Sequence, residues 1–349
     1  MRVWKYEAHS FCLTLKFNVR VDEVHAYVEF PNLFLPTPCV GMEFIMFKRF
    51  ELHNHTNESD APISCAELAA MMAQEGVDCF AITDHNTVSG HHVLRELMGQ
   101  YPAMQCAYGM EYTTYFGHIV CPVLETYVPW DSVDRHKPER LFEACKRAGG
   151  ITGIAHPFAY GEPFAMGCRF EMNIRDFSHV DYIEVINNSE SLHTVNGPAI
   201  RWWEELVLGG IPVSACAGMD LHRVTDRMDG RFATYAEGRE GGDAVAELRA
   251  ALSVQRTWVS KGMLLDWHRE GEAIRFTLRD VNKPGFEAPS AYTLLLKGQN
   301  GERTLDITGG ELTVPLPEFS DVEIPKLYGI DTALDHLVCI APVIRKHLI

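Results

Sequence analysis

The stretch FELHNHTNESD, residues 50–60, places His53 and His55 two positions apart and follows them with Asp60. Residues i and i+2 of a β-strand point to the same side, so the two imidazoles can converge on one point. Imidazole and carboxylate groups are common ligands of transition metals in proteins. The stretch therefore predicts a metal site where a strand gives way to a polar turn.

Seven short runs along the chain have the composition of β-strands. They lie at residues 50–56, 77–85, 104–114, 151–157, 181–187, 211–220 and 256–262. Most are apolar throughout, which is typical of parallel strands buried on both faces. Strand and helix alternate about seven times over about 210 residues, which predicts a parallel α/β barrel or a strongly curved α/β sheet.

Helical stretches separate these runs, and their ends carry recognisable signals. Ser64 and Glu67 match a capping box at the start of a helix that should end near Gly76. Residues 138–150 and 199–210 also read as helices, and each closes on glycine before the next strand.

The two ends of the chain have a different pattern of apolar and polar residues from its middle. Residues 10–30, 263–281, 291–307 and 310–316 alternate apolar and polar side chains, which is typical of antiparallel strands. We expect an N-terminal β segment (1–49), an α/β domain (50–262) and a C-terminal β-rich segment (263–349). The two β segments should pack together, because neither alone has enough strands for a core.

The overall composition is that of a globular protein. The 349 residues are 46% hydrophobic and 22% charged, and the formal charge of -16 argues against stable nucleic-acid binding. No apolar run reaches the roughly 20 residues of a membrane span, and the first 20 residues lack a signal-peptide pattern. We therefore expect a cytoplasmic protein that binds no membrane. The ten cysteines form no C-x-x-C pair and read as small core residues.

Titratable residues recur at the ends of the predicted strands, where parallel α/β folds gather their chemistry. Besides the opening stretch, these are Asp84 and His85, Glu111 and His118, His156, and Asp220 and His222. A single histidine or aspartate of this kind is usually a surface residue or a helix cap. Six of the chain's 16 histidines gathered at five strand ends instead predict a metal cluster.

These motifs stand in the order found in the PHP (polymerase and histidinol phosphatase) metallohydrolases, which the chain resembles over about residues 50–262. The matching segments are ELHNHT, SD, ITDHNT, GMEYTT, AHP and MDLH. The segments TDHNTVSG and GMEYTTYFGH are more similar to the carbaryl-hydrolase-like branch of that superfamily than to the histidinol phosphatases. The resemblance implies a distorted (β/α)7-type barrel. The family often has glycine after the Ser-Asp pair, where this chain has Ala61 and Pro62.

The resemblance also implies three sets of metal ligands. The first is His53, His55, Glu111 and Asp220; the second shares Glu111 and adds His118 and His156; the third is Asp60, His85 and His222. The mixed imidazole and carboxylate donors suit two or three divalent ions of zinc, manganese or iron, since no thiolate lies in these motifs.

Several further side chains have expected supporting roles. Asp84 should orient a ligand imidazole through its second ring nitrogen. Glu184, with Asn187 or Asn188, could do the same or be a structural carboxylate. Arg223 is a candidate clamp for a developing oxyanion, ahead of Arg169 in the loop after the fourth strand.

The sequence therefore predicts a hydrolase in which two cations share an attacking hydroxide. It contains neither a phosphate-binding P-loop nor a G-x-S-x-G nucleophile motif. Because a third ligand set suits the dispersed charge of a phosphoryl transition state, we favour hydrolysis of a small phosphomonoester or phosphodiester. A carboxylic or carbamic ester hydrolase is the alternative, and a non-catalytic metal-binding module is a third reading.

Overall fold

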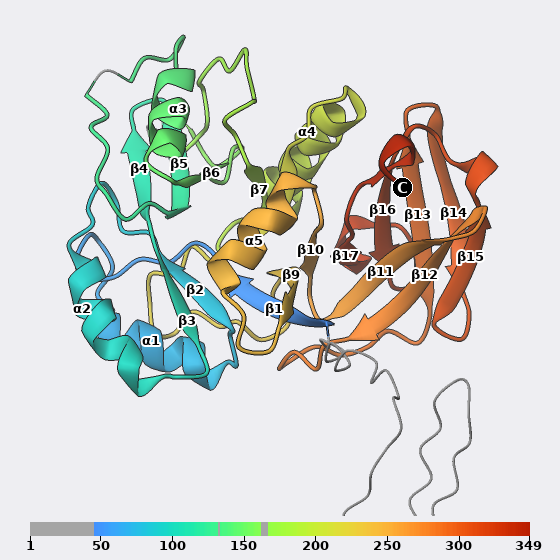
Figure 1. Cartoon of the computed structure of the whole chain (residues 1–349), viewed down its shortest axis with the longest axis horizontal. Coiled ribbons are helices and arrows are strands. Elements are labelled where there is room, and N and C mark those ends of the chain that lie inside the picture. Colours follow the sequence, from blue (N-terminus) through green and yellow to red (C-terminus); the bar gives the residue numbers. More distant parts are fainter. Residues whose placement is uncertain (1–44, 132, 162–166) are drawn as a thin grey trace, which may run out of the picture. The chain divides into compact units, whose positions relative to one another are not determined.

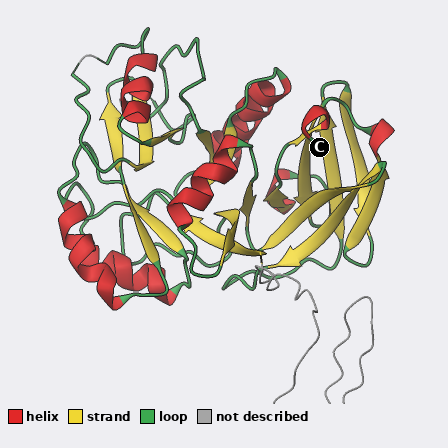
Figure 2. Cartoon of the chain, viewed as in Figure 1, coloured by secondary structure: helices red, strands yellow, loops and turns green. Residues whose placement is uncertain are grey.

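The computed structural model of the protein describes residues 45–131, 133–161 and 167–349 (Figure 1). In this part of the chain the strands form sheets of ten, five and three strands, accompanied by five α-helices. Figure 2 shows helices and strands intermixed through the first part of the described chain, whereas the C-terminal part is almost entirely strand. The fold is thus mixed α/β, with several sheets and few helices.

The first three strands are parallel neighbours within the ten-stranded sheet. They are β1 (Ile45–Glu51), β2 (Cys79–Ile82) and β3 (Gln105–Tyr108), connected through α1 (Cys65–Gln74) and α2 (Gly90–Leu97). The predicted capping box is confirmed, because the Ser64 hydroxyl accepts from the Glu67 amide while the Glu67 carboxylate accepts from the Ser64 amide. Gly76 follows α1 with a φ of 67°, a left-handed conformation that glycine adopts readily.

Five strands form a second sheet in the order β4-β5-β6-β7-β8. They are β4 (Met110–Thr114), β5 (Gly117–Val123), β6 (Ile151–Ile154), β7 (Tyr182–Asn187) and β8 (Ser214–Gly218). The last three are parallel, whereas β5 pairs antiparallel with both β4 and β6. Helices α3 (Glu139–Arg147) and α4 (Gly197–Leu208) precede β6 and β8, as the sequence predicts.

Two more strands lie between this region and the C-terminal part. β9 (Ala233–Arg239) and β10 (Thr257–Ser260) flank α5 (Ala244–Ser253) and pair antiparallel with each other. β9 also pairs antiparallel with β1. The prediction of parallel strands is therefore confirmed for β1, β2, β3, β6, β7 and β8, but wrong for β4 and β10, which form antiparallel ladders.

The expected sevenfold alternation of strand and helix is also incomplete. The described residues hold no α-helix between β3 and β4, between β6 and β7, or between β8 and β9. The sequence patterns also do not predict β5 or β9. The distorted (β/α)7 barrel stays a prediction.

The C-terminal strands match the predicted antiparallel pattern. β11 (Met263–Glu270), β12 (Ala273–Asp280) and β15 (Glu311–Pro315) form the three-stranded sheet. β13 (Tyr292–Gly298), β14 (Gly301–Ile307), β16 (Val322–Tyr328), β17 (Leu337–Ile340) and β18 (Ile344–Arg345) continue the ten-stranded sheet beyond β10. Buried Trp258, Trp267 and Phe276 belong to the core that these strands share.

Two features bear on the predicted division of the chain. β1 runs across the boundary expected between residues 49 and 50. Residues 1–44, which make up most of the predicted N-terminal β segment, lie outside the described residues. The packing of the two β segments therefore stays a prediction. None of the helices described in the structure is long and apolar enough to cross a bilayer.

Candidate metal centre

The two histidines of the opening stretch follow directly after β1. His53 and His55 are both buried, and their ring centroids lie 5.1 Å apart. Asn54, between them, directs its side-chain amide elsewhere and donates to the backbone oxygen of Ala81 at 3.0 Å. The alternation expected of extended backbone therefore brings the two imidazoles together.

Glu111, on β4, lies at the centre of the site. The side chain is fully buried, and its two carboxylate oxygens lie within 3.5 Å of ring nitrogens from five histidines. Oε2 is 3.3 Å from His53 Nε2, 3.5 Å from His55 Nε2 and 3.0 Å from His85 Nδ1, while Oε1 is 3.0 Å from His118 Nδ1 and 3.4 Å from His156 Nε2. This is the arrangement that a bridging carboxylate requires.

A second carboxylate, Asp220, approaches the same imidazoles from the end of β8. Its Oδ1 lies 3.1 Å from His55 Nε2 and 3.5 Å from His53 Nε2. Its Oδ2 accepts hydrogen bonds from the Asn187 amide at 3.2 Å and the Ser189 hydroxyl at 3.3 Å. Asp220 has a φ of 50°, an uncommon conformation for aspartate that is often found at functional sites.

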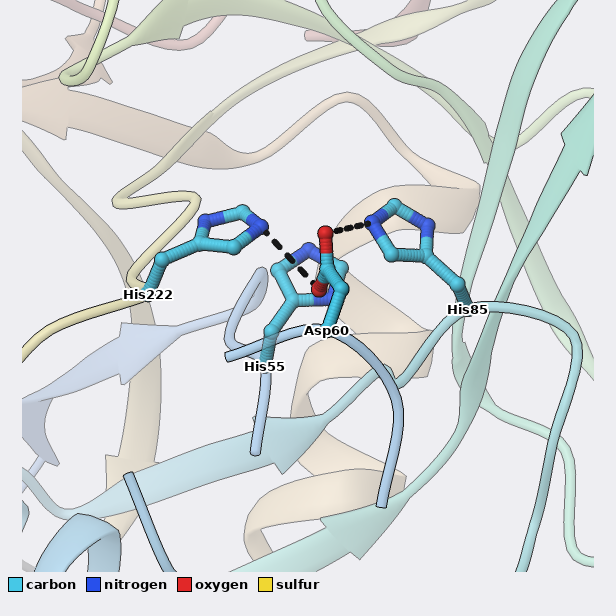
Figure 3. A group of neighbouring side chains, drawn as sticks. All are labelled: His55, Asp60, His85 and His222. Atoms are coloured by element: carbon cyan, nitrogen blue, oxygen red, sulfur yellow. Dashed lines mark ion pairs between the residues drawn. The ribbon is translucent and has the colours of Figure 1, made fainter. Parts of the chain in front are cut away.

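Asp60 is the centre of a third, more exposed group (Figure 3). Its Oδ1 lies 3.4 Å from His222 Nε2, and its Oδ2 lies 3.5 Å from His85 Nε2. The His55 ring stacks between these two imidazoles, with centroids 4.2 Å from His85 and 4.3 Å from His222. The Asp60 side chain is 56% exposed, so this group faces solvent while Glu111 does not.

All nine predicted ligands fall into four overlapping groups of donor atoms. The groups are His55, Asp60, His85 and His222; His53, His55 and Glu111; His53, His156 and Asp220; and His85, Glu111 and His118. The third predicted set is thus brought together with His55 added. The first set is divided, because Asp220 falls in a different group from Glu111 and His55, and the second is divided, because His118 and His156 join different groups.

The donor atoms fit divalent metal ions on two counts. Two ligands that bind one tetrahedral ion at about 2.0–2.1 Å are about 3.3–3.4 Å apart. The nitrogen–oxygen separations around Glu111, at 3.0–3.5 Å, agree with this spacing. Moreover, His53 Nε2, both ring nitrogens of His55, and Glu111 Oε2 are buried without a hydrogen-bond partner among the described residues. Such atoms are rare in folded proteins unless something else binds them.

Mutual attraction shifts the pKa of most groups in the cluster. Burial lowers the pKa of His53, but the carboxylates of Glu111, Glu184 and Asp220 outweigh it and hold that pKa well above its usual value. Burial likewise raises the pKa of Glu111, yet the neighbouring imidazoles hold it well below the usual range. The same balance, led by Glu111, raises the pKa of His156 to about 9. Without metal the cluster therefore retains protons that a cation must displace.

Glu184, on β7, orients part of the cluster. Its Oε1 accepts from His53 Nδ1 at 2.9 Å, which leaves His53 Nε2 directed at Glu111. Its Oε2 accepts from the backbone amide of His156 at 2.8 Å. Gly218 leaves room for this pair, because a Cβ there would lie 2.1 Å from Glu184 Oε1 and 2.6 Å from His53 Cβ. Glu184 thus has the orienting role that the sequence left open.

Asp84 differs from its expected role as the partner of an imidazole. Its Oδ1 accepts from the Thr56 amide and the Ser59 hydroxyl, both at 2.6 Å, and its Oδ2 accepts from the Thr56 hydroxyl at 2.7 Å. These contacts use both oxygens to hold the turn that leads to Asp60. The reason is local, because Asp84 follows β2 beside that turn, whereas the imidazoles converge on Glu111.

The turn itself accommodates the Ala61-Pro62 pair. The Ala61 amide donates to the Thr56 carbonyl at 3.2 Å, and Ala61 is buried. Ala61 is not among the described residues with positive φ, so the turn closes without a glycine at this position.

The two candidate arginines lie in exposed positions. The backbone amide of Arg223 donates to Asp226 Oδ2 at 2.9 Å, and the same oxygen accepts from the His222 amide at 3.0 Å. The Arg223 and Arg169 side chains are exposed. A clamp role for Arg223 stays a proposal.

Thr113 and Ser189 are contacts of the ligands that the sequence patterns do not predict. The Thr113 hydroxyl contacts His85 Nδ1, and the Ser189 hydroxyl contacts Asp220. A signal for Thr113 exists in retrospect, because it stands two positions after Glu111 on β4 and therefore shares its face.

Comparisons with known proteins bear on the fold. No family model matches the chain, and no curated protein matches it. A two-domain protein from Bacteroides vulgatus ATCC 8482, which contains a predicted PHP-like metal-dependent phosphoesterase, is similar in structure, with a TM-score of 0.53 and 15% identity. The similarity covers 86% of this chain and 96% of that one, so the two share a fold over most of their lengths.

Two further solved structures are similar over half of the chain. A candidate metal-dependent phosphoesterase from Bifidobacterium adolescentis ATCC 15703 has a TM-score of 0.38 and 14% identity, over 50% of this chain and 87% of that one. An amidohydrolase from Chromobacterium violaceum, solved with bound sulfate and no metal, has a TM-score of 0.35 and 16% identity over the same shares.

Proposed function

We propose that the protein is a metal-dependent hydrolase of small phosphate esters. The observation that carries the proposal is Glu111, one buried carboxylate surrounded by ring nitrogens of five histidines at 3.0–3.5 Å. A structural ion pair needs one or two partners, whereas five convergent imidazoles supply the coordination of more than one cation. The predicted PHP-like phosphoesterase domain of the Bacteroides neighbour supports the same activity.

Three sets of residues would hold the ions. A first ion would take His53, His55, Glu111 and Asp220, a second would take Glu111, His118 and His156, and a third would take Asp60, His85 and His222. The expected ions are zinc, manganese or iron in the divalent state. When bound, such ions lower the pKa of a water molecule toward neutrality and attract the negative oxygens of a phosphate.

The chain's own residues would orient the donors and order the turns. Glu184 fixes which nitrogen of His53 faces the cluster, and Asn187 and Ser189 hold one oxygen of Asp220 away from it. Asp84 holds the turn before Asp60. Arg223, exposed beside His222, would attract the substrate's anionic group.

The third set is the reason for preferring phosphate over other esters. A carboxylic or carbamic ester develops one oxyanion, whereas a phosphoryl group spreads charge over several oxygens that a further cation can stabilise. Asp60, with its carboxylate 3.4–3.5 Å from two imidazoles, completes that set. Hydrolysis of a carboxylic or carbamic ester, as in the carbaryl-hydrolase-like branch, is the alternative activity. A non-catalytic metal-binding module is the third.

A panel of phosphomonoesters, phosphodiesters and aryl esters, assayed with Mn²⁺ and with Zn²⁺, tests the proposal. We expect phosphoester turnover that Asp60→Ala lowers far more than any aryl-ester turnover. Ready cleavage of aryl esters or carbamates, with no phosphoester turnover under any metal and no effect of Asp60→Ala, would select the alternative. A chain that purifies without transition metal and hydrolyses nothing would be the non-catalytic module. The cytoplasmic location and the 49/50 and 262/263 boundaries stay predictions.

A further inference from the structure

The loop that carries His222 is held at both of its ends by the α/β part of the chain. At its start, the His55 amide donates to the Leu221 carbonyl at 2.9 Å. At its end, the Asn188 side chain accepts from the Phe232 amide at 3.0 Å and donates to the Phe232 carbonyl at 2.8 Å. Ten residues lie between these two anchors.

The middle of this loop is held from the connection between β12 and β13. Lys283, only 5% exposed, donates from Nζ to the Met228 carbonyl at 2.7 Å. Met228 is itself buried, and its sulfur lies 3.7 Å from Nη2 of Arg49. A lysine from the predicted C-terminal segment thus reaches 55 residues back along the chain to fix this loop.

Glycines allow the two connections to approach this closely. Gly285 has a φ of 70°, and a Cβ there would lie 2.7 Å from Asp229 Cβ and 2.9 Å from the Gly230 nitrogen. Gly230 also has a positive φ, of 62°, and a Cβ on it would lie 3.2 Å from the Gly285 carbonyl. The backbones meet beside Met228, so the lysine contact belongs to a packed junction.

We propose that Lys283 is a positioning residue for the third metal, holding the 221–232 loop so that His222 meets Asp60 and His85. The inference rests on the proposed function only in assuming that Asp60, His85 and His222 bind a metal ion. The contact between Lys283 and Met228 is a feature of the fold and does not depend on that function. In this proposal the C-terminal part of the chain helps to position a metal ligand, although it supplies none of the ligands named above.

The placement of the lysine supports this role over incidental packing. Burial lowers the pKa of Lys283 to about 8, with the Arg49 guanidinium adding to the shift. The carboxylates of Glu51, Glu75 and Asp229 oppose that shift. A buried charge is unfavourable unless it is paired or hydrogen-bonded, and the Met228 carbonyl supplies the hydrogen bond that holds the ammonium group at this junction. The His222 side chain, by contrast, is only half-buried, so its position depends on the conformation of the loop.

The test compares Lys283→Met with a matched control, Lys346→Met. Lys346 makes the same kind of contact, from Nζ to the Phe319 carbonyl at 3.1 Å, but within the C-terminal part. We expect Lys283→Met to purify with one metal ion fewer per chain than the wild type, as His222→Ala should, while Lys346→Met keeps the full complement. Elemental analysis after gel filtration measures this, and an excess of metal should restore the lost ion in Lys283→Met but not in His222→Ala.

A double variant decides whether the lysine acts through the loop. If it does, Lys283→Met combined with His222→Ala should have the metal content and turnover of His222→Ala alone. Full metal content in a folded Lys283→Met protein, or losses that add in the double variant, would overturn the proposal. Lys283→Gln, whose amide can still donate to a carbonyl, keeps the test open if the methionine variant does not fold. Because metal content is measured without substrate, a failed phosphoester assay would count against the proposed function and leave this inference standing.

Discussion

Two buried glutamates of this chain, Glu111 in the metal centre and Glu204 on α4, are surrounded by basic groups in different ways. Glu204 is 1% exposed, and its oxygens contact the ammonium groups of Lys297, at 2.6 Å, and Lys326. Burial would lower the pKa of Lys326, but Glu204 outweighs it and raises that pKa. This carboxylate is therefore satisfied by permanent cations that fasten α4 to β13 and β16.

Glu111 is surrounded instead by imidazoles, which can lose a proton and offer an electron pair. Buried atoms without a hydrogen-bond partner in the described part of the chain remain around it, including both ring nitrogens of His55. The two glutamates teach that burial of a charge alone does not mark a functional site. What separates the metal centre from a structural ion cluster is an excess of groups that can act as ligands.

The largest effect should come from Glu111→Gln. Replacing one carboxylate oxygen by an amide removes the charge that lets a single side chain bind two cations. We expect metal loss and a fall in turnover of about a thousandfold or more. Elemental analysis and phosphoester assays measure the two outcomes. Retention of all metal would mean that Glu111 is a structural residue like Glu204.

Glu204→Gln should instead affect stability. It leaves two lysines without their carboxylate, one of them 8% exposed at its side chain, which should lower the free energy of unfolding by about 3 kcal/mol. Metal content and turnover per folded chain should not change. Denaturant unfolding of the metal-free protein measures the change in the free energy of unfolding. A loss of metal from Glu204→Gln would contradict the distinction between Glu204 and Glu111.

Within the centre, Glu184→Gln should weaken metal binding by about 10–100-fold, because His53 would lose the partner that fixes its ring. Asp84→Asn should have a smaller effect that concerns mainly the third ion, since Asp84 contacts only the turn before Asp60. Titration of the metal-free variants with Zn²⁺ or Mn²⁺ compares them. Equal losses would mean that Asp84 acts on the whole cluster.

The smallest effect should be a dependence on pH. The pKa of His156 is raised to about 9, so in the metal-free protein its contact with Glu111 contributes stability that is present in full below pH 6.5. That contribution is lost as pH rises through about 9. Metal binding has the opposite sign, because the proton must leave His156 first, and its affinity should rise over the same interval. Metal titrations from pH 6.5 to 9 measure this, and His156→Ala should flatten the dependence that His156 contributes.

Much of the site could be predicted because its signals are local. The i, i+2 pair of His53 and His55 depends only on extended backbone, and the capping box at Ser64 depends on a span of four residues. The supporting contacts could not be predicted in this way. The strand-end pattern predicts an imidazole partner for Asp84, which instead binds Thr56, because a carboxylate at a strand end has several partners within reach.

The direction of the strands could not be predicted from local patterns either. Thr257 to Ser260 on β10 are buried like a parallel strand, yet β10 has antiparallel neighbours on both sides. Burial on both faces produces the same apolar run in either case, so the run does not reveal its partners.

The sequence by itself determined which residue types stand at the strand ends, and thus that a cluster of imidazoles and carboxylates would form. Only the tertiary structure decided which atoms meet. His53 finds Glu184 from 131 residues away, and Lys283 reaches Met228 from a different part of the fold. Such pairs depend on how separate sheets and loops pack against one another, and local patterns of polarity do not determine that packing.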